Sequence, residues 1–94
     1  MAQPAGLLVR DDSLLVVIDL QPGFFAGYPD SERAAVADAA ARAAWLTGVA
    51  AALGVPVVVT EEDPARNGPT DPAILARASA GTRVIPATMT TVAR

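Results

Sequence analysis

Apolar residues in this chain gather into three short runs that are separated by polar or helix-breaking segments. The first run, Leu14 to Ile18, is continuous, β-branched in its middle and preceded by Asp11-Asp12-Ser13. The other two runs cover positions 56–60 and 83–85. Because short continuous apolar runs are typical of strands in a parallel sheet that is covered on both faces, we expect strands near 14–20, 56–60 and 83–85.

Two helices are expected between these strands. The first lies near 31–53: Asp30 or Ser31 can cap its start, and Gly54 ends it before Pro56. Its apolar positions recur every three or four residues and form one stripe, made of Val36, Ala39, Ala43, Leu46, Ala50 and Leu53. The second helix lies near 72–80, after a loop rich in Pro, Gly and Asn. This alternation of strands and helices predicts an α/β fold with parallel strands and right-handed crossovers.

The composition narrows the size and the partners of this domain. A chain of 94 residues with 52% hydrophobic content closes one core, so residues 1–94 are treated as a single domain. The net charge is −3 and all seven basic residues are arginine, which argues against a nucleic-acid partner, because clustered cations drive that binding. Neither a secretory signal nor an apolar run near the ~20 residues of a membrane span is found. We therefore expect a cytoplasmic protein with no membrane partner.

The absent residue types exclude several kinds of chemistry. The sequence has no cysteine and no histidine, so it offers neither the usual zinc ligands nor a Ser-His or Cys-His pair. Carboxylates remain as the only side chains for a hard metal ion. No cofactor and no metal are predicted.

Carboxylates follow the first two expected strands. Asp19 ends the first apolar run, and Glu61-Glu62 end the second, so all three would lie at the edge where open α/β sheets bind ligands. Asp19 loses hydration there and needs a hydrogen-bonding partner. It is interpreted either as a functional carboxylate or as an acceptor for the backbone amides of the turn at 21–23. The acidic run 61–63 is interpreted as a solvated loop.

Other enzyme and binding classes with a strand-end aspartate fit these residues less well. Haloacid dehalogenase-type phosphotransferases have a second aspartate two residues on, but position 21 is Gln21 and the chain has no lysine. Response-regulator receivers have an acidic pair at the carboxyl end of the first strand, whereas Asp11-Asp12 precede it here. Neither the dinucleotide-binding G-x-G-x-x-G motif nor the P-loop motif with its lysine is present.

Three segments together resemble the isochorismatase-like cysteine hydrolase family. Positions 15–24, Leu-Val-Val-Ile-Asp-Leu-Gln-Pro-Gly-Phe, are similar to its first-strand signature, in which an aspartate stands two residues before a glutamine and an aromatic residue follows. Positions 54–62 and the loop at 67–72 are similar to its second strand and the connection after it. The resemblance implies a parallel, three-layer, Rossmann-like sheet of six strands, of which this chain carries about the first three.

The resemblance also implies a catalytic role for Asp19. Family members use an Asp-Lys-Cys triad, and Asp19 matches the aspartate that helps to deprotonate the cysteine. Ala87 stands where the family lysine is expected, just after the third strand. The family cysteine belongs to a later strand-helix turn that these 94 residues do not include. Residues 1–94 are therefore interpreted as a truncated, partial isochorismatase-like domain.

Two more residues are implied to line the substrate site. By analogy with the family, Gln21 and Phe24 would border its mouth, although the same residues can also be a turn-stabilising amide and an aromatic that caps the core. The metal-binding nicotinamidase-like branch uses histidines, which this chain lacks.

The expected function is cysteine-dependent hydrolysis of a small amide or enol-ether substrate, with this chain inactive alone. The alternative is a non-catalytic binding or assembly module. In the family fold the first strand is central, so here one of its edges would be unpaired, and self-association through that edge is expected.

Overall fold

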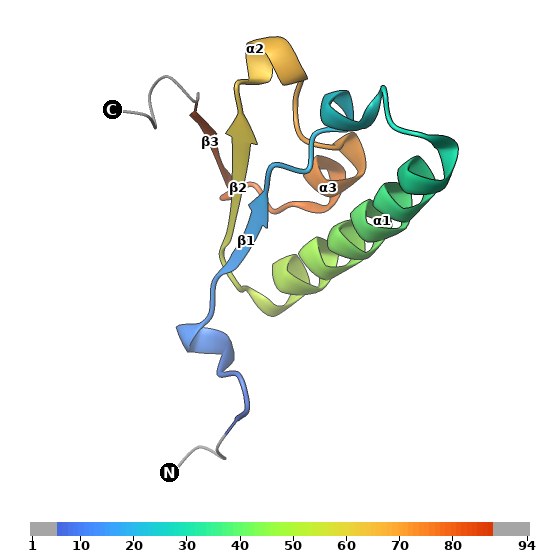
Figure 1. Ribbon diagram of the computed structural model, residues 1–94. Helices are drawn as coiled ribbons and strands as arrows, with labels where there is room; N and C mark the ends of the chain where they lie inside the picture. Colours follow the sequence, from blue (N-terminus) through green and yellow to red (C-terminus); the bar gives the residue numbers. More distant parts are fainter. Residues whose placement is uncertain (1–5, 88–94) are drawn as a thin grey trace.

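The computed structural model describes residues 6–87 and has three strands, three α-helices and two short 3-10 helices (Figure 1). In chain order they are η1 (Arg10–Asp12), β1 (Leu15–Ile18), η2 (Pro22–Phe25), α1 (Asp30–Leu53), β2 (Val57–Glu62), α2 (Pro64–Asn67), α3 (Pro72–Arg77) and β3 (Arg83–Ala87). The threonine-rich tail after Ala87 lies outside the described residues.

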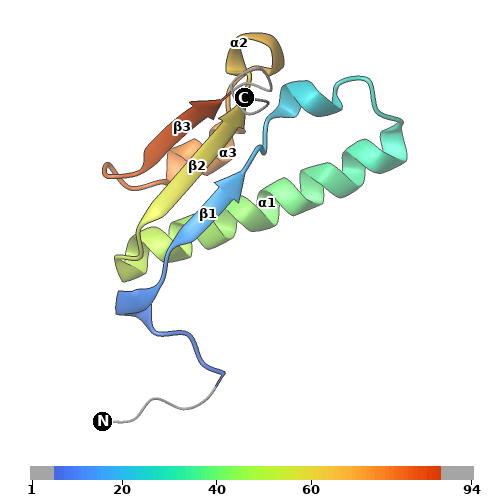
Figure 2. The same ribbon diagram turned by 60° about the vertical axis from the view of Figure 1, so that its left-hand side comes forward.

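The strands form one parallel sheet in the order β1-β2-β3. In its middle, Val17 pairs with Val59, and Val59 pairs with Val84. Both crossovers advance across the sheet in the same direction, so the right-handed rule places α1 and α3 on the same face. Figure 2 shows both helices behind the three strands. The predicted α/β fold with parallel strands is confirmed.

The core lies between this helical layer and the sheet. Its buried members from the sheet are Val17, Val57 and Val59, and those from the helices are Ala44, Ala50 and Ile74. Ile74 of α3 and Val59 of β2 are fully buried. Alanines on α1 let the helix axis come close to the branched side chains of the strands.

The phase of the α1 stripe differs from the sequence prediction. The buried positions are Ala40, Ala44, Thr47 and Ala50, whereas Leu46 is 44% exposed and Leu53 is 51% exposed. The helix is rich in alanine on all sides, so the spacing of apolar residues does not distinguish its buried face from its exposed face. The buried positions carry small residues, which let α1 pack closely against α3 and the sheet. Thr47 satisfies its buried hydroxyl by donating to the carbonyl of Ala43 at 2.7 Å.

Several element ends also differ from the expected positions. α1 begins at Asp30 after Pro29, without a side-chain cap, while its end at Gly54 is as predicted, with a left-handed φ of 73°. α3 ends at Arg77 rather than near 80, and the short helix α2 occupies part of the expected loop. β3 continues through Pro86 to Ala87. Proline is tolerated there because β3 is an edge strand of this sheet.

The second face of the sheet is open in residues 6–87, contrary to the expectation that both faces are covered. Val16 is 42% exposed, Ile18 is 68% exposed and Ile85 is 46% exposed. Val16 and Ile18 alternate along β1 with the buried Val17. Ile85 lies on the same face as Ile18, because both residues pair with Thr60 of β2. The described part of the chain is therefore a two-layer fold, and β1 lies at an edge of its sheet.

α1 is the one helix among residues 6–87 that is long and apolar enough to cross a membrane by length and composition, with a mean hydropathy of 1.2 over its best window. A helix that packs against a sheet passes the same test. Ala44 and Ala50 of α1 belong to the core described above, but only 22% of the apolar window of this helix is buried within the described residues.

Candidate functional site

Asp19 leaves the sheet directly after β1 in a left-handed conformation, with a φ of 53°. Its N–H donates to the carbonyl of Thr60 at 3.2 Å, and its carboxylate Oδ1 accepts from the Thr60 hydroxyl at 2.9 Å. The partner of the carboxylate is therefore a side chain of the neighbouring strand, not the backbone amides of the turn at 21–23. Aspartate is among the residues that tolerate this backbone region, so the sequence and the local geometry agree.

Gln21 joins the segment after β1 to the segment after β2. Its side chain is fully buried, and its Nε2 donates to the carbonyl of Glu62 at 3.1 Å and to that of Gly68 at 2.7 Å. Its Oε1 accepts from the N–H of Glu62 at 2.8 Å. The structure thus places Gln21 as a clamp between two segments, and its predicted contact with a substrate stays a prediction.

Two aromatic residues of η2, Phe24 and Phe25, follow Gln21 along the chain. Phe24, the predicted substrate-binding aromatic, is half-buried, and its ring centroid is 6.1 Å from that of Phe25. Phe25 in turn packs edge-on against Tyr28, with 5.4 Å between their ring centroids. Gly23 lies directly against the backbone of Asn67, since a Cβ atom at position 23 would collide with the Asn67 carbonyl.

The sequence predicts that Glu61 belongs to a solvated loop, and this prediction is wrong. Glu61 belongs to β2, is 8% exposed, and its Oε2 accepts from both the N–H and the hydroxyl of Thr70, at 2.7 and 2.8 Å. Thr70 is itself fully buried. The burial pattern of β2 alternates, and Glu61 falls on the helix-covered side. The burial of Glu61 could not be predicted from neighbouring residues, because its hydrogen-bonding partner Thr70 lies nine residues further along the chain.

Ala87 closes the same edge of the sheet. It pairs with Glu62 across β2 and β3, and its carbonyl accepts from the N–H of Asp63. Asp19 thus follows β1, while Glu62 and Ala87 are the last residues of the two neighbouring parallel strands. The sequence supplies no lysine at this edge, and within residues 6–87 no group of three carboxylates, histidines or cysteines is arranged to hold a metal ion.

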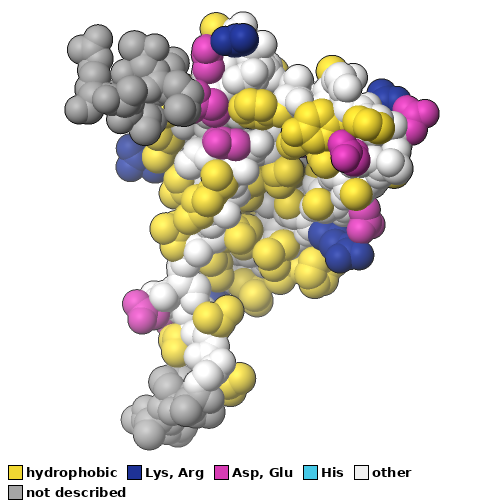
Figure 3. Space-filling model, viewed as in Figure 1, with side chains coloured by type: hydrophobic (Ala, Val, Ile, Leu, Met, Phe, Trp, Pro, Cys, Tyr) yellow, Lys and Arg dark blue, Asp and Glu magenta, His cyan; other side chains and the backbone are white. Residues whose placement is uncertain are grey.

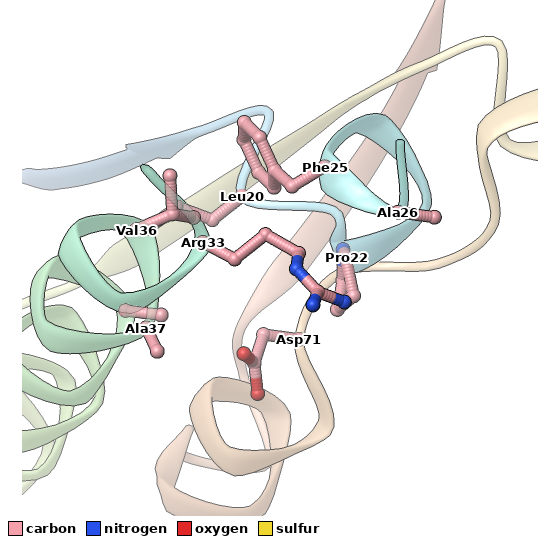
Figure 4. A pocket seen from close by; sticks show the side chains of 9 residues that line it. Leu20, Pro22, Phe25, Ala26, Arg33, Val36, Ala37 and Asp71 are labelled. Carbon is pink, nitrogen blue, oxygen red and sulfur yellow. The ribbon is translucent and has the colours of Figure 1, made fainter. Parts of the chain in front are cut away.

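A pocket that the sequence did not reveal lies beside this edge, between η2, the first turns of α1 and the start of α3 (Figure 4). Its volume is about 280 Å³, and its lining includes Leu20, Phe25, Val36, Arg33 and Asp71. These residues come from three separate elements, and no local motif connects them. Asp19, Gln21 and Phe24 do not line it.

Apolar side chains also gather on the surface over β1 and α1 in the view of Figure 3. The most exposed large ones before β1 are Leu8, at 92%, Leu7, at 66%, and Leu14, at 57%. Leu14, Val16 and Ile18 alternate along the chain, so they expose apolar surface on the same face beside the unpaired edge of the sheet.

Comparison with known proteins gives a fold but no family. No protein-family model matches the chain, and no curated protein matches it. The chain is similar to a solved structure of the MAR1 ribonuclease from Caenorhabditis elegans, with a TM-score of 0.73 and 24% sequence identity over 85% of this chain. The match spans 39% of the ribonuclease chain, so this sequence corresponds to less than half of its structural neighbour. At this identity the likeness shows the α/β fold alone.

Proposed function

We propose that these residues form the amino-terminal part of an isochorismatase-like cysteine hydrolase domain, in which Asp19 provides the carboxylate that activates a thiol. The observation that carries the proposal is the setting of Asp19. Its Oδ1 is held by Thr60, and its Oδ2 has no hydrogen-bond partner within residues 6–87. A carboxylate fixed through one oxygen, with the other oxygen free, is suited to accept a proton from a nearby nucleophile.

The thiol and the lysine of such a site have to come from outside these 94 residues, which contain neither cysteine nor lysine. The unpaired edge of β1 is next to Asp19, so a further strand paired at that edge would end near its carboxylate. The proposed reaction on a small amide is attack by the thiol, loss of the amine to give a thioester, and hydrolysis of that thioester by water to release the acid and the thiol. With an enol ether the thiol would add to the vinyl carbon, the alcohol would leave, and water would displace the thiol to give the carbonyl product. No cofactor is part of this proposal.

The proposal is tested by assaying the purified 94-residue chain with isochorismate and with simple primary amides. We expect hydrolysis no faster than in buffer, because removal of a nucleophile lowers kcat by many orders of magnitude. Alkylation with iodoacetamide should leave the result unchanged. Measurable turnover that Asp19→Asn abolishes would contradict the proposal, since it would require a carboxylate mechanism within this chain.

An assembly module is the second candidate function, and the open side of the sheet favours it. β1 has no strand partner on one side within the described part of the chain, and Val16 and Ile18 expose apolar surface next to that edge. Unpaired edges with apolar side chains pair with other strands. In this alternative the partner is a second copy of the chain, which pairs through β1.

The ribonuclease activity named for the structural neighbour is not carried over to this chain. The two sequences share 24% identity, and this chain has a net charge of −3 without a single lysine. Phosphate contacts supply most of the affinity for RNA and need clustered cations. We therefore propose a small-molecule substrate and no nucleic-acid partner, in a cytoplasmic protein that makes no membrane contact.

A further inference from the structure

The pocket beside η2 combines an apolar wall with two charges of opposite sign. Leu20, Phe25 and Val36 contribute apolar side chains, and Arg33 and Asp71 are the charged residues of its lining. Figure 4 shows the three apolar side chains grouped together, with the Arg33 guanidinium reaching past them toward Pro22 and Asp71 below it. The lining therefore carries no net charge but has separate positive and negative positions.

Both charged groups have capacity for a ligand. Arg33 is half exposed and pairs with Asp30, which is not part of the lining. Only one guanidinium nitrogen is used in that pair, and guanidinium has five N–H donors. Asp71 uses Oδ1 to accept from the N–H of Ala73 at 2.9 Å. Across residues 6–87 no ion pair of 4.0 Å or less joins Arg33 to Asp71, so the two charges do not cancel each other by direct contact.

The walls of the pocket are held by hydrogen bonds and by an aromatic contact. The N–H of Asp71 donates to the carbonyl of Leu20 at 2.7 Å, which ties the start of α3 to the segment after β1. Gln21 anchors that same segment to β2, and Phe25 is held against Tyr28 by edge-on aromatic contact. A pocket whose walls are held in this way loses little conformational entropy on binding.

We propose that this pocket binds a small zwitterionic amino acid with an apolar side chain. The carboxylate would accept from Arg33, the ammonium group would donate to Asp71, and the side chain would pack on Leu20, Phe25 and Val36. A volume of about 280 Å³ lies just below the ~300–1,000 Å³ range of drug-sized ligand sites, which suits a ligand as small as an amino acid. A simple anion gains at Arg33 and is repelled by Asp71, so the pair of charges favours the zwitterion. This site is separate from the hydrolase proposal and does not depend on it.

The test is a titration of the 94-residue chain with L-leucine, followed by amide chemical shifts. We expect saturable shifts at Leu20, Val36 and Asp71. Arg33→Gln and Asp71→Asn should each raise the dissociation constant by about tenfold or more, the effect of losing one charged contact. Asparagine is as good an N-cap as aspartate, so Asp71→Asn removes the charge while keeping the start of α3.

Matched controls separate this site from general charge effects. Arg42→Gln removes another arginine of the same helix, one that pairs with Asp38 at 2.9 Å and is absent from the pocket lining, and it should bind L-leucine like the wild type. Leucinamide lacks the carboxylate and 4-methylpentanoate lacks the ammonium group, so both should bind at least about tenfold more weakly. Equal binding of 4-methylpentanoate and L-leucine would overturn the proposal, as would the absence of saturable shifts at millimolar L-leucine.

Discussion

Asp19 and Gln21 stand two residues apart and serve different purposes. Asp19 is half-buried at the edge of the sheet and keeps one carboxylate oxygen free of protein partners in residues 6–87. Gln21 is fully buried, and both polar atoms of its amide are bound to backbone groups after β2. An amide can donate and accept at once, which a carboxylate cannot do. The chemistry of the two side chains therefore matches their separate positions.

The left-handed backbone of Asp19 leads to a prediction about stability. Asp19→Asn should change the free energy of unfolding by less than about 0.5 kcal/mol, because asparagine also tolerates a positive φ and can still accept from Thr60. Asp19→Val should cost about 1–2 kcal/mol, since a branched Cβ at a φ of 53° meets the following carbonyl. Urea denaturation of the two variants measures the difference. Equal stabilities would show that the backbone relaxes out of this conformation.

At the scale of elements, the sequence predicted what depends on neighbouring residues. Continuous apolar runs located the three strands, and Gly54 located the end of α1. The sequence pattern did not predict which face of α1 is buried, because alanine occurs all around that helix. The partners of Gln21 are 41 and 47 residues away, and the pocket between η2, α1 and α3 unites residues from three elements. Such contacts follow from tertiary packing, which no local pattern encodes.

The contact between η2 and α2 can be tested at two glycines. Gly23→Ala should destabilise the protein by about 1–3 kcal/mol, because its Cβ would collide with the backbone of Asn67 and force the two turns apart. Gly27 has no atom within 4 Å of an added Cβ, so Gly27→Ala should be neutral or stabilise by up to about 1 kcal/mol. Thermal unfolding followed by circular dichroism measures both. A Gly23→Ala variant as stable as Gly27→Ala would mean that the turns are not packed together in solution.

The molecule as a whole is less compact than its length allows. Its radius of gyration is 15.2 Å, against about 12 Å for a compact domain of this size. One face of the sheet is bare in the described residues, and the apolar surface around Leu14 and Ile18 has no covering element there. Burial of that surface would be favourable by about 25 cal/mol per Å². Association through β1 is therefore expected unless another segment covers it.

Two charge substitutions distinguish association from folding. Val16 is 42% exposed on the open face, whereas Val17 is 5% exposed against the helices. Val17→Lys should unfold the protein, because it buries an unpaired charge in the core. Val16→Lys should leave the circular dichroism spectrum unchanged and shift the chain toward the monomer, since lysine on an edge strand discourages pairing. Sedimentation velocity at micromolar concentration gives the oligomeric state, with Ala34→Lys, an exposed position on α1, as the control that should sediment like the wild type. A wild-type chain that is already a stable monomer, with slowly exchanging amides along both edges of β1, would show that this edge is covered within the chain itself.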